Sequence, residues 1–137
     1  MTAKISTLIT AEAAELVCGS VDPSGTKHSR AVIAIDGRCA GGKTMLARAA
    51  ETLLRERGIP CRVLHADDFF LRPELRSFYD RCFFVDIESG EQSERILRRD
   101  GTERARTFAR RWIPLEERYI AECRPQLSAD AVFRLMD

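Results

Sequence analysis

The sequence lacks the features of most secreted, membrane and nucleic-acid-binding proteins. Its five cysteines are an odd number and form no C-x-x-C pair, which disfavours a disulfide framework and a zinc site and favours free thiols in a reducing compartment. The net charge is only +1, so nothing in the overall charge favours nucleic acid or an anionic membrane as a partner. Glu12 and Glu15 interrupt the one apolar stretch that could serve a signal peptide, and no run reaches membrane-spanning length. We therefore expect a cytoplasmic protein.

The composition is that of one folded domain. The chain has 137 residues, of which 45% are hydrophobic, enough for a single core spanning residues 1–137. Near the N-terminus, apolar residues recur at helical spacing between residues 4 and 18. This pattern predicts an amphipathic N-terminal helix within residues 1–20 that packs on the domain and carries no chemistry.

Residues 37–44 read Gly-Arg-Cys-Ala-Gly-Gly-Lys-Thr, which is the G-x-x-x-x-G-K-[ST] phosphate-binding pattern. The pattern follows an apolar run at 31–35 and precedes a helical segment that ends at Gly58, so it lies between a strand and a helix. Glycines let the backbone turn its N–H groups inward around phosphate oxygens, and the helix directs its positive end at the same oxygens. The lysine would reach the β- and γ-phosphates, and the threonine hydroxyl would bind Mg²⁺. The expected binding positions are Gly37, Ala40, Gly41, Gly42, Lys43 and Thr44.

Two adjacent carboxylates follow the next apolar segment. Residues 61–65 are predicted to form a second strand, and Asp67 and Asp68 come directly after it. The carboxyl ends of parallel strands form the edge where open α/β sheets bind ligands, so Asp67 is favoured as a functional residue. The pleat of a strand would turn Asp68 to the other side, where it either caps a turn or binds the metal.

The order of apolar segments predicts the class of fold. Further strands are expected near 83–87 and 131–134, and helical segments lie between the strands. Alternating strands and helices favour a doubly wound parallel α/β sheet with helices on both faces, in three layers, of the P-loop NTPase type.

Seven arginines lie between residues 95 and 111, against two acids. A charge run of this kind is usually a solvated helix face, and most of these arginines fit that interpretation. Phosphoryl transfer also needs cations over the γ-phosphate, and guanidinium groups can supply them. Arg95 and Arg99 lie one helical turn apart and so share a face of the helix that Gly101 is expected to end.

Taken together, these motifs resemble a known family. Residues 34–44, the His-Ala-Asp-Asp-Phe-Phe-Leu-Arg-Pro stretch at 65–73, and residues 79–87, 95–101 and 108–119 resemble uridine kinase-like proteins of the P-loop nucleoside kinase group. The resemblance covers most of the chain and is more specific than the phosphate loop alone. It implies an ATP-dependent phosphotransferase that uses Mg·ATP and a small hydroxyl acceptor similar to a nucleoside.

The resemblance also implies roles for individual residues. In such kinases the carboxylate that matches Asp67 takes the proton from the acceptor hydroxyl. Arg99, Arg106 and Arg111 fall in the lid that closes over ATP, here residues 95–118. The catalytic residues implied are therefore Asp67, Lys43 and Arg99, and the metal ligands are Thr44 and, as a substitute for a carboxylate that the family carries elsewhere, Asp68.

The chain departs from the family between residues 68 and 83. Only twelve residues, 71–82, stand where the family has a long block with a central strand and most of the acceptor-binding segment. The carboxylate expected after that strand is missing unless Asp68 replaces it. We therefore expect a smaller sheet with the strand order 61–65, 31–35, 83–87, 131–134, whose exposed edge favours self-association. A nucleotide-binding module or a truncated kinase remnant, with little or no turnover, is the alternative function.

Overall fold

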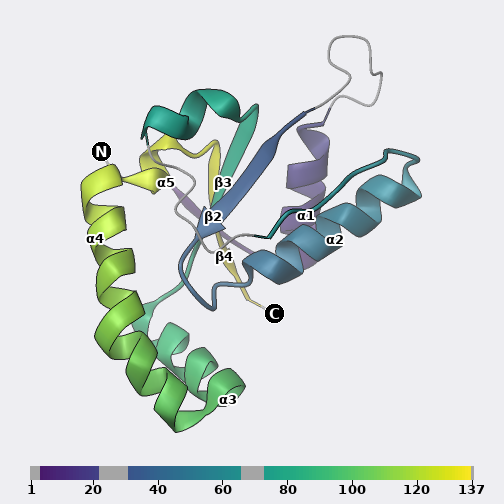
Figure 1. Ribbon diagram of the computed structural model, residues 1–137. Helices are drawn as coiled ribbons and strands as arrows, with labels where there is room; N and C mark the ends of the chain where they lie inside the picture. The colour runs from purple at the N-terminus through teal and green to yellow at the C-terminus, as the bar shows by residue number, and fades with distance from the viewer. Residues whose placement is uncertain (1–3, 22–30, 66–72, 137) are drawn as a thin grey trace.

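The computed structural model describes residues 4–21, 31–65 and 73–136. Its centre is a four-stranded sheet in which every neighbouring pair of strands is parallel. The order across the sheet is β1-β4-β3-β2 (Figure 1). The strands are β1 (Ile5–Leu8), β2 (Ile33–Gly37), β3 (Arg81–Asp86) and β4 (Ala131–Leu135). The expected α/β class with a parallel sheet is confirmed.

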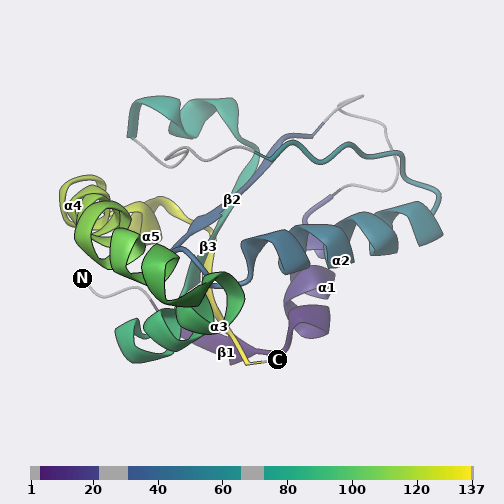
Figure 2. The ribbon, with the colours of Figure 1, turned by 60° about the horizontal axis from the view of Figure 1, so that its bottom comes forward.

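Helices lie on both sides of this sheet (Figures 1 and 2). On one side, α1 (Thr10–Gly19) and α2 (Lys43–Glu56) pack together against alternate residues of β3 and β4, including Phe83 and Phe133, whose rings stack. On the other side lie α4 (Ile113–Cys123) and the short α5 (Pro125–Ser128). There Ile120 packs near Phe84 and Val132 in a second apolar cluster. The period-2 alternation of the strands thus supplies both faces of the core.

The strand before the phosphate loop and the strand after it are direct neighbours. β2 pairs with β3 from Ile33 opposite Arg81 to Gly37 opposite Val85, and α2 forms the crossover between them. A 3₁₀ helix, η1 (Pro73–Phe78), precedes β3. Asp80 fixes the start of the pair, because its N–H donates to Val32 O (2.8 Å) and its carboxylate accepts from Val32 N (2.7 Å).

An arm of helices leaves the carboxyl end of β3. α3 (Ser89–Thr107) is kinked at Gly101, where φ is 85° and ψ is 175°, so the expected break at this glycine is confirmed. The chain continues through one π-helical turn, η2 (Phe108–Trp112), directly into α4. The helical winding changes over residues 108–112, just before Pro114, with no gap between helices.

Two predictions about the strands are wrong. The predicted N-terminal helix begins only at Thr10, because Ile5–Leu8 pairs with β4 as an edge strand. Residues 61–65 form no strand, and Leu64 within them is 83% exposed. The predicted order of 31–35, 83–87 and 131–134 is found, but the fourth strand is added beside β4 and not beside β2. Within the described chain, no helix is both long enough and apolar enough to cross a membrane.

Candidate functional site

The glycine-rich turn leaves the carboxyl end of β2 and enters α2 at Lys43. Gly37 lies so close to β3 that a Cβ atom built on it would be 2.1 Å from Val85 O, and its φ is +148°. The N–H of Arg38 donates to the same carbonyl oxygen at 3.0 Å. Ala40 and Gly42 both have positive φ, 61° and 102°. Residues with positive φ turn successive N–H groups toward one side, which is the geometry of an anion-binding turn.

Lys43 is folded over this turn. Its Nζ donates to Gly37 O at 2.7 Å, so the ammonium group lies against the first residue of the motif. Thr44, in the first turn of α2, is exposed. The structure therefore brings together the six positions that the motif predicts, at the N-terminal end of α2.

Two arginines of α3, which the i, i+4 spacing predicts on one face of the helix, both contact the loop. Arg95 donates to Ala40 O (3.1 Å) and to Leu135 O (3.1 Å), which fastens the loop to the end of β4. Arg99 donates to Cys39 Sγ at 3.9 Å and forms an ion pair with Asp100, and these contacts raise the pKa of Arg99, with the hydrogen bond to Asp100 as the larger cause.

An open cleft runs from the loop along the arm. Its described lining includes Arg95, Arg98, Arg99 and Arg104, with Phe108, Trp112 and Leu115 beyond them. Neither Arg106 nor Arg111 belongs to this described lining, and both are exposed. Of the three predicted lid arginines, the structure thus brings only Arg99 to the loop.

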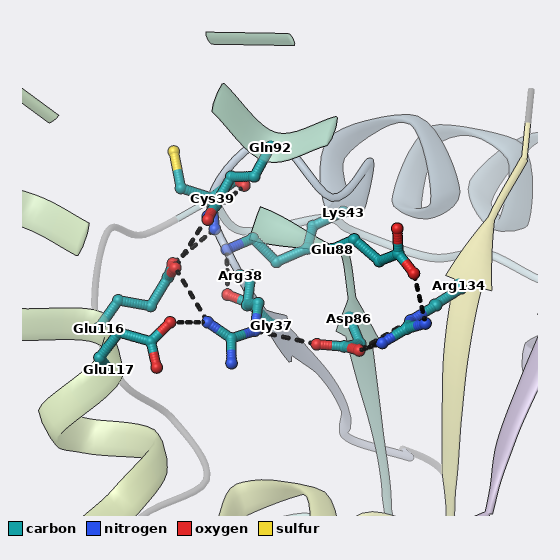
Figure 3. A network of polar contacts seen from close by, with 10 residues as sticks. All are labelled: Gly37, Arg38, Cys39, Lys43, Asp86, Glu88, Gln92, Glu116, Glu117 and Arg134. Carbon is teal, nitrogen blue, oxygen red and sulfur yellow. Dashed lines mark hydrogen bonds and ion pairs between the residues drawn. The ribbon is translucent and has the colours of Figure 1, made fainter. Parts of the chain in front are cut away.

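A carboxylate at the end of β3 anchors the second residue of the loop. Asp86, whose side chain is 14% exposed, accepts from Arg38 Nε at 2.9 Å and from Arg134 Nε at 2.9 Å (Figure 3). The Arg38 guanidinium also pairs with Glu117 of α4. Burial alone would lower the pKa of Arg38, but its contacts with Glu117 and Asp86 outweigh burial and raise that pKa.

The third residue of the loop is held at both ends of its backbone. The Cys39 N–H donates to Glu116 Oε1 at 2.5 Å, and Cys39 O accepts from Gln92 Nε2 at 2.9 Å. Gln92 Nε2 also donates to Glu116 Oε2 at 2.9 Å (Figure 3). Gln92 is 1% exposed and Glu116 is 7% exposed, so this arrangement is inside the molecule.

The strand that leads to the loop carries a buried acid. Asp36 is 3% exposed, and its carboxylate accepts from Tyr119 Oη of α4 at 2.5 Å and from Gly37 N at 2.8 Å. Burying a charged group requires hydrogen bonds of this kind. The pair fastens α4 to the carboxyl end of β2, immediately before the phosphate motif.

The two carboxylates predicted to act in catalysis and metal binding, Asp67 and Asp68, lie outside the described residues. Among the residues that are described, no three His, Cys, Asp or Glu side chains form a group able to hold a metal ion. Asp36 and Asp86 near the loop are engaged by Tyr119 and by two arginines. Thr44 is thus the described residue best suited to bind a metal.

Sequence reasoning missed the side chains that hold the loop. Asp86 and Glu117 bind Arg38, Gln92 and Glu116 bind the backbone of Cys39, and Tyr119 and Arg134 act one contact further away, on Asp36 and Asp86. Glu116 and Cys39 are separated by 77 positions, and no short motif joins residues so far apart. Comparisons with protein-family models, with curated proteins and with solved structures found no match.

Proposed function

We propose that this chain is an ATP-dependent phosphotransferase similar to the uridine kinases, with a P-loop NTPase type of fold and a small hydroxyl compound as the acceptor. The observation that carries the proposal is the position of Lys43, whose ammonium group lies over a turn with positive φ at Ala40 and Gly42. A lysine at this place can leave Gly37 O for the β- and γ-phosphates of a bound nucleotide. Arg99, which donates to Cys39 Sγ, supplies a second cation next to the loop.

The parts of the site have different roles in phosphoryl transfer. The N–H groups of the loop and the N-terminus of α2 hold the phosphates, and Lys43 and Arg99 stabilise charge on the transferring group. The acceptor oxygen attacks the γ-phosphorus while the bond to the β–γ bridging oxygen breaks, and the acceptor proton passes to Asp67. Thr44 and Asp68 would hold Mg²⁺, which would neutralise the negative charge of the reacting phosphates.

The described residues fit a magnesium ion that is carried mainly by the nucleotide. Mg²⁺ keeps several waters and needs only one or two protein oxygens in addition to phosphates. The Thr44 hydroxyl, exposed at the start of α2, supplies one such oxygen, and Asp68 is the expected second ligand.

A nucleotide-binding module with little turnover is the second candidate. It is favoured by the short connection before β3, in which the 71–82 segment replaces most of an acceptor site. The lack of a strand at 61–65 also favours the binding module, because Asp67 and Asp68 were expected at the carboxyl end of that strand.

Release of ADP from Mg·ATP, with and without uridine and other hydroxyl acceptors, separates the candidates. A phosphotransferase releases more ADP when its acceptor is added, and Asp67→Asn returns the rate to the acceptor-free value. Binding of Mg·ATP with ADP release that no acceptor changes would favour the binding module. If neither Mg·ATP nor Mg·GTP binds, both candidates fail.

A further inference from the structure

The residue at the centre of this inference is Cys39, the third position of the phosphate loop. Its N–H and its carbonyl oxygen are both bound by side chains from the arm, Glu116 of α4 and Gln92 of α3. These two side chains also bond to each other, which closes a ring of three hydrogen bonds (Figure 3). We call Gln92 and Glu116 the Cys39 clamp.

The chemistry of the clamp requires a carboxylate at position 116. Its Oε1 accepts from a backbone N–H and its Oε2 accepts from a carboxamide, so both oxygens must be acceptors. A glutamine at this position would present an NH₂ group to one of the two donors. Rotating the Gln92 carboxamide by 180° would not restore the contacts, because its oxygen would then face Cys39 O, which is also an acceptor.

The clamp contacts the loop away from the expected phosphate positions. Those positions are Gly37 and residues 40–44, whereas the clamp uses only the backbone of Cys39. On the same arm, Arg95 binds Ala40 O and Arg99 reaches Cys39 Sγ. The loop and the two arginines are therefore joined by hydrogen bonds to the same arm, of which the bond between Gln92 and Glu116 is buried and the contact of Arg99 with Cys39 is exposed.

We propose that Gln92 and Glu116 are positioning residues for nucleotide binding, which hold the phosphate loop against the arm so that Lys43 and Arg99 converge on one triphosphate. This inference rests on the proposed function and adds the residues that shape the loop. Neither residue touches the nucleotide. Loss of the clamp should weaken binding by about 10- to 100-fold, the range found when outer hydrogen-bond partners of metal ligands are lost.

The test compares Glu116→Gln with the same change at the far end of α4, Glu122→Gln. Glu122 is exposed and pairs only with Arg118 among the contacts described, so it is a matched control. Dissociation constants for Mg·ATP are measured by the fluorescence of Trp112, the single tryptophan, which lies in the lining of the cleft. The temperature is kept well below each melting point, because a merely structural role would lower stability and leave the affinity of folded molecules unchanged.

A second readout needs no nucleotide. Release of the clamp should expose the Cys39 backbone and speed alkylation of its thiol in the free protein. Burial raises the pKa of Cys18 and of Cys82, so these two thiols react slowly and serve as internal references. Gln92→Met, which keeps the length of the side chain and removes the donor, is a second variant if Glu116→Gln does not fold.

The expected result is at least tenfold weaker Mg·ATP binding and faster Cys39 labelling in the clamp variants, with Glu122→Gln equal to wild type. Affinity within twofold of wild type in a folded clamp variant overturns the inference. If wild-type protein does not bind Mg·ATP, the proposed function fails, and the labelling rates alone then test whether the clamp holds the loop. Equal labelling in wild type and variant would show that the clamp does not hold the loop.

Discussion

At the scale of single residues, Gly37 has the least room for a side chain among the glycines that the structure describes. A Cβ atom there would meet Val85 O at 2.1 Å, and φ is +148°. Gly37→Ala should therefore lower the free energy of unfolding by about 3 kcal/mol or more, through overpacking and backbone strain. Urea unfolding measures the change.

Gly90→Ala is the matched control for that substitution. Gly90 lies in the first turn of α3 and has open space around its Cα, with no heavy atom within 4 Å of the added Cβ. Alanine is the better helix former by about 1 kcal/mol, so this variant should be neutral or more stable. If Gly37→Ala is tolerated equally well, the close packing of the loop on β3 is wrong.

Lys43 is the residue whose loss should affect the ligand and not the fold. A ligand that binds only native protein adds about 2.7 kcal/mol at a concentration of 100 Kd, a shift of several degrees in melting temperature. Lys43→Ala should abolish the shift caused by Mg·ATP and change the melting point of the free protein little. Arg48→Ala, on the exposed side of α2, should keep the full shift. A full shift in Lys43→Ala would contradict the proposed site.

Sequence reasoning at this scale could identify the loop because its residues are contiguous. A strand, eight motif residues and a helix define the local chemistry without knowledge of the tertiary structure. The clamp is different, because Gln92 and Glu116 are 24 positions apart and meet only when α3 and α4 fold beside the loop. Arg95 and Arg99 are an intermediate case. Helical periodicity predicts that they share one face of their helix, but it does not say which part of the molecule that face contacts.

At the scale of elements, α4 is the helix that ties the arm to the sheet. Tyr119 donates to the carboxylate of buried Asp36, just before the phosphate loop. Tyr119→Phe removes this donor and leaves the carboxylate less well satisfied, which should cost about 1–3 kcal/mol. Thermal and urea unfolding should both show the loss. A variant as stable as wild type would mean that Asp36 finds another donor at no cost.

Two elements show where sequence patterns become ambiguous. Ile5 and Leu8 fit the stripe of a helix, yet residues 5–8 pair with β4, and four residues are too few for periodicity to decide between helix and strand. Residues 61–65 alternate well enough for a strand, but a strand also needs a neighbour with which to share hydrogen bonds. Here β2 pairs with β3 and is an edge strand of the described sheet, yet residues 61–65 do not pair with its open side, and Leu64 is exposed.

At the scale of the whole molecule, the four strands of the described sheet pair with one another without residues 61–65, which were expected to lie beside β2. β2, α2 and β3 form one crossover unit, and β1 extends the other side of the sheet next to β4. β2 is left as an edge strand of the described sheet, so self-association through this edge stays a prediction. The positions of 33–37, 81–86 and 131–135 could be predicted, because each is an apolar run whose two faces are both covered.

The same architecture places the proposed nucleotide site apart from the shortened connection. The loop, Lys43 and Arg99 are carried by β2, α2 and the arm, which lie outside the shortened connection at residues 71–82. A kinase must also hold the acceptor in line with the γ-phosphate, and orientation can supply about 7–11 kcal/mol of the barrier. Displacement of the acceptor by about 1 Å can already cost a hundredfold in rate.

We therefore expect Mg·ATP to bind while acceptor phosphorylation is weak. Saturating uridine or another nucleoside should raise ADP release by no more than about tenfold over the acceptor-free rate, because the short connection leaves the acceptor loosely oriented. Asp67→Asn should remove this increase and leave the affinity for Mg·ATP unchanged, whereas Lys43→Ala should remove binding itself. Rapid phosphorylation of uridine would contradict the prediction, since it would show that residues 71–82 form a complete acceptor site despite their length.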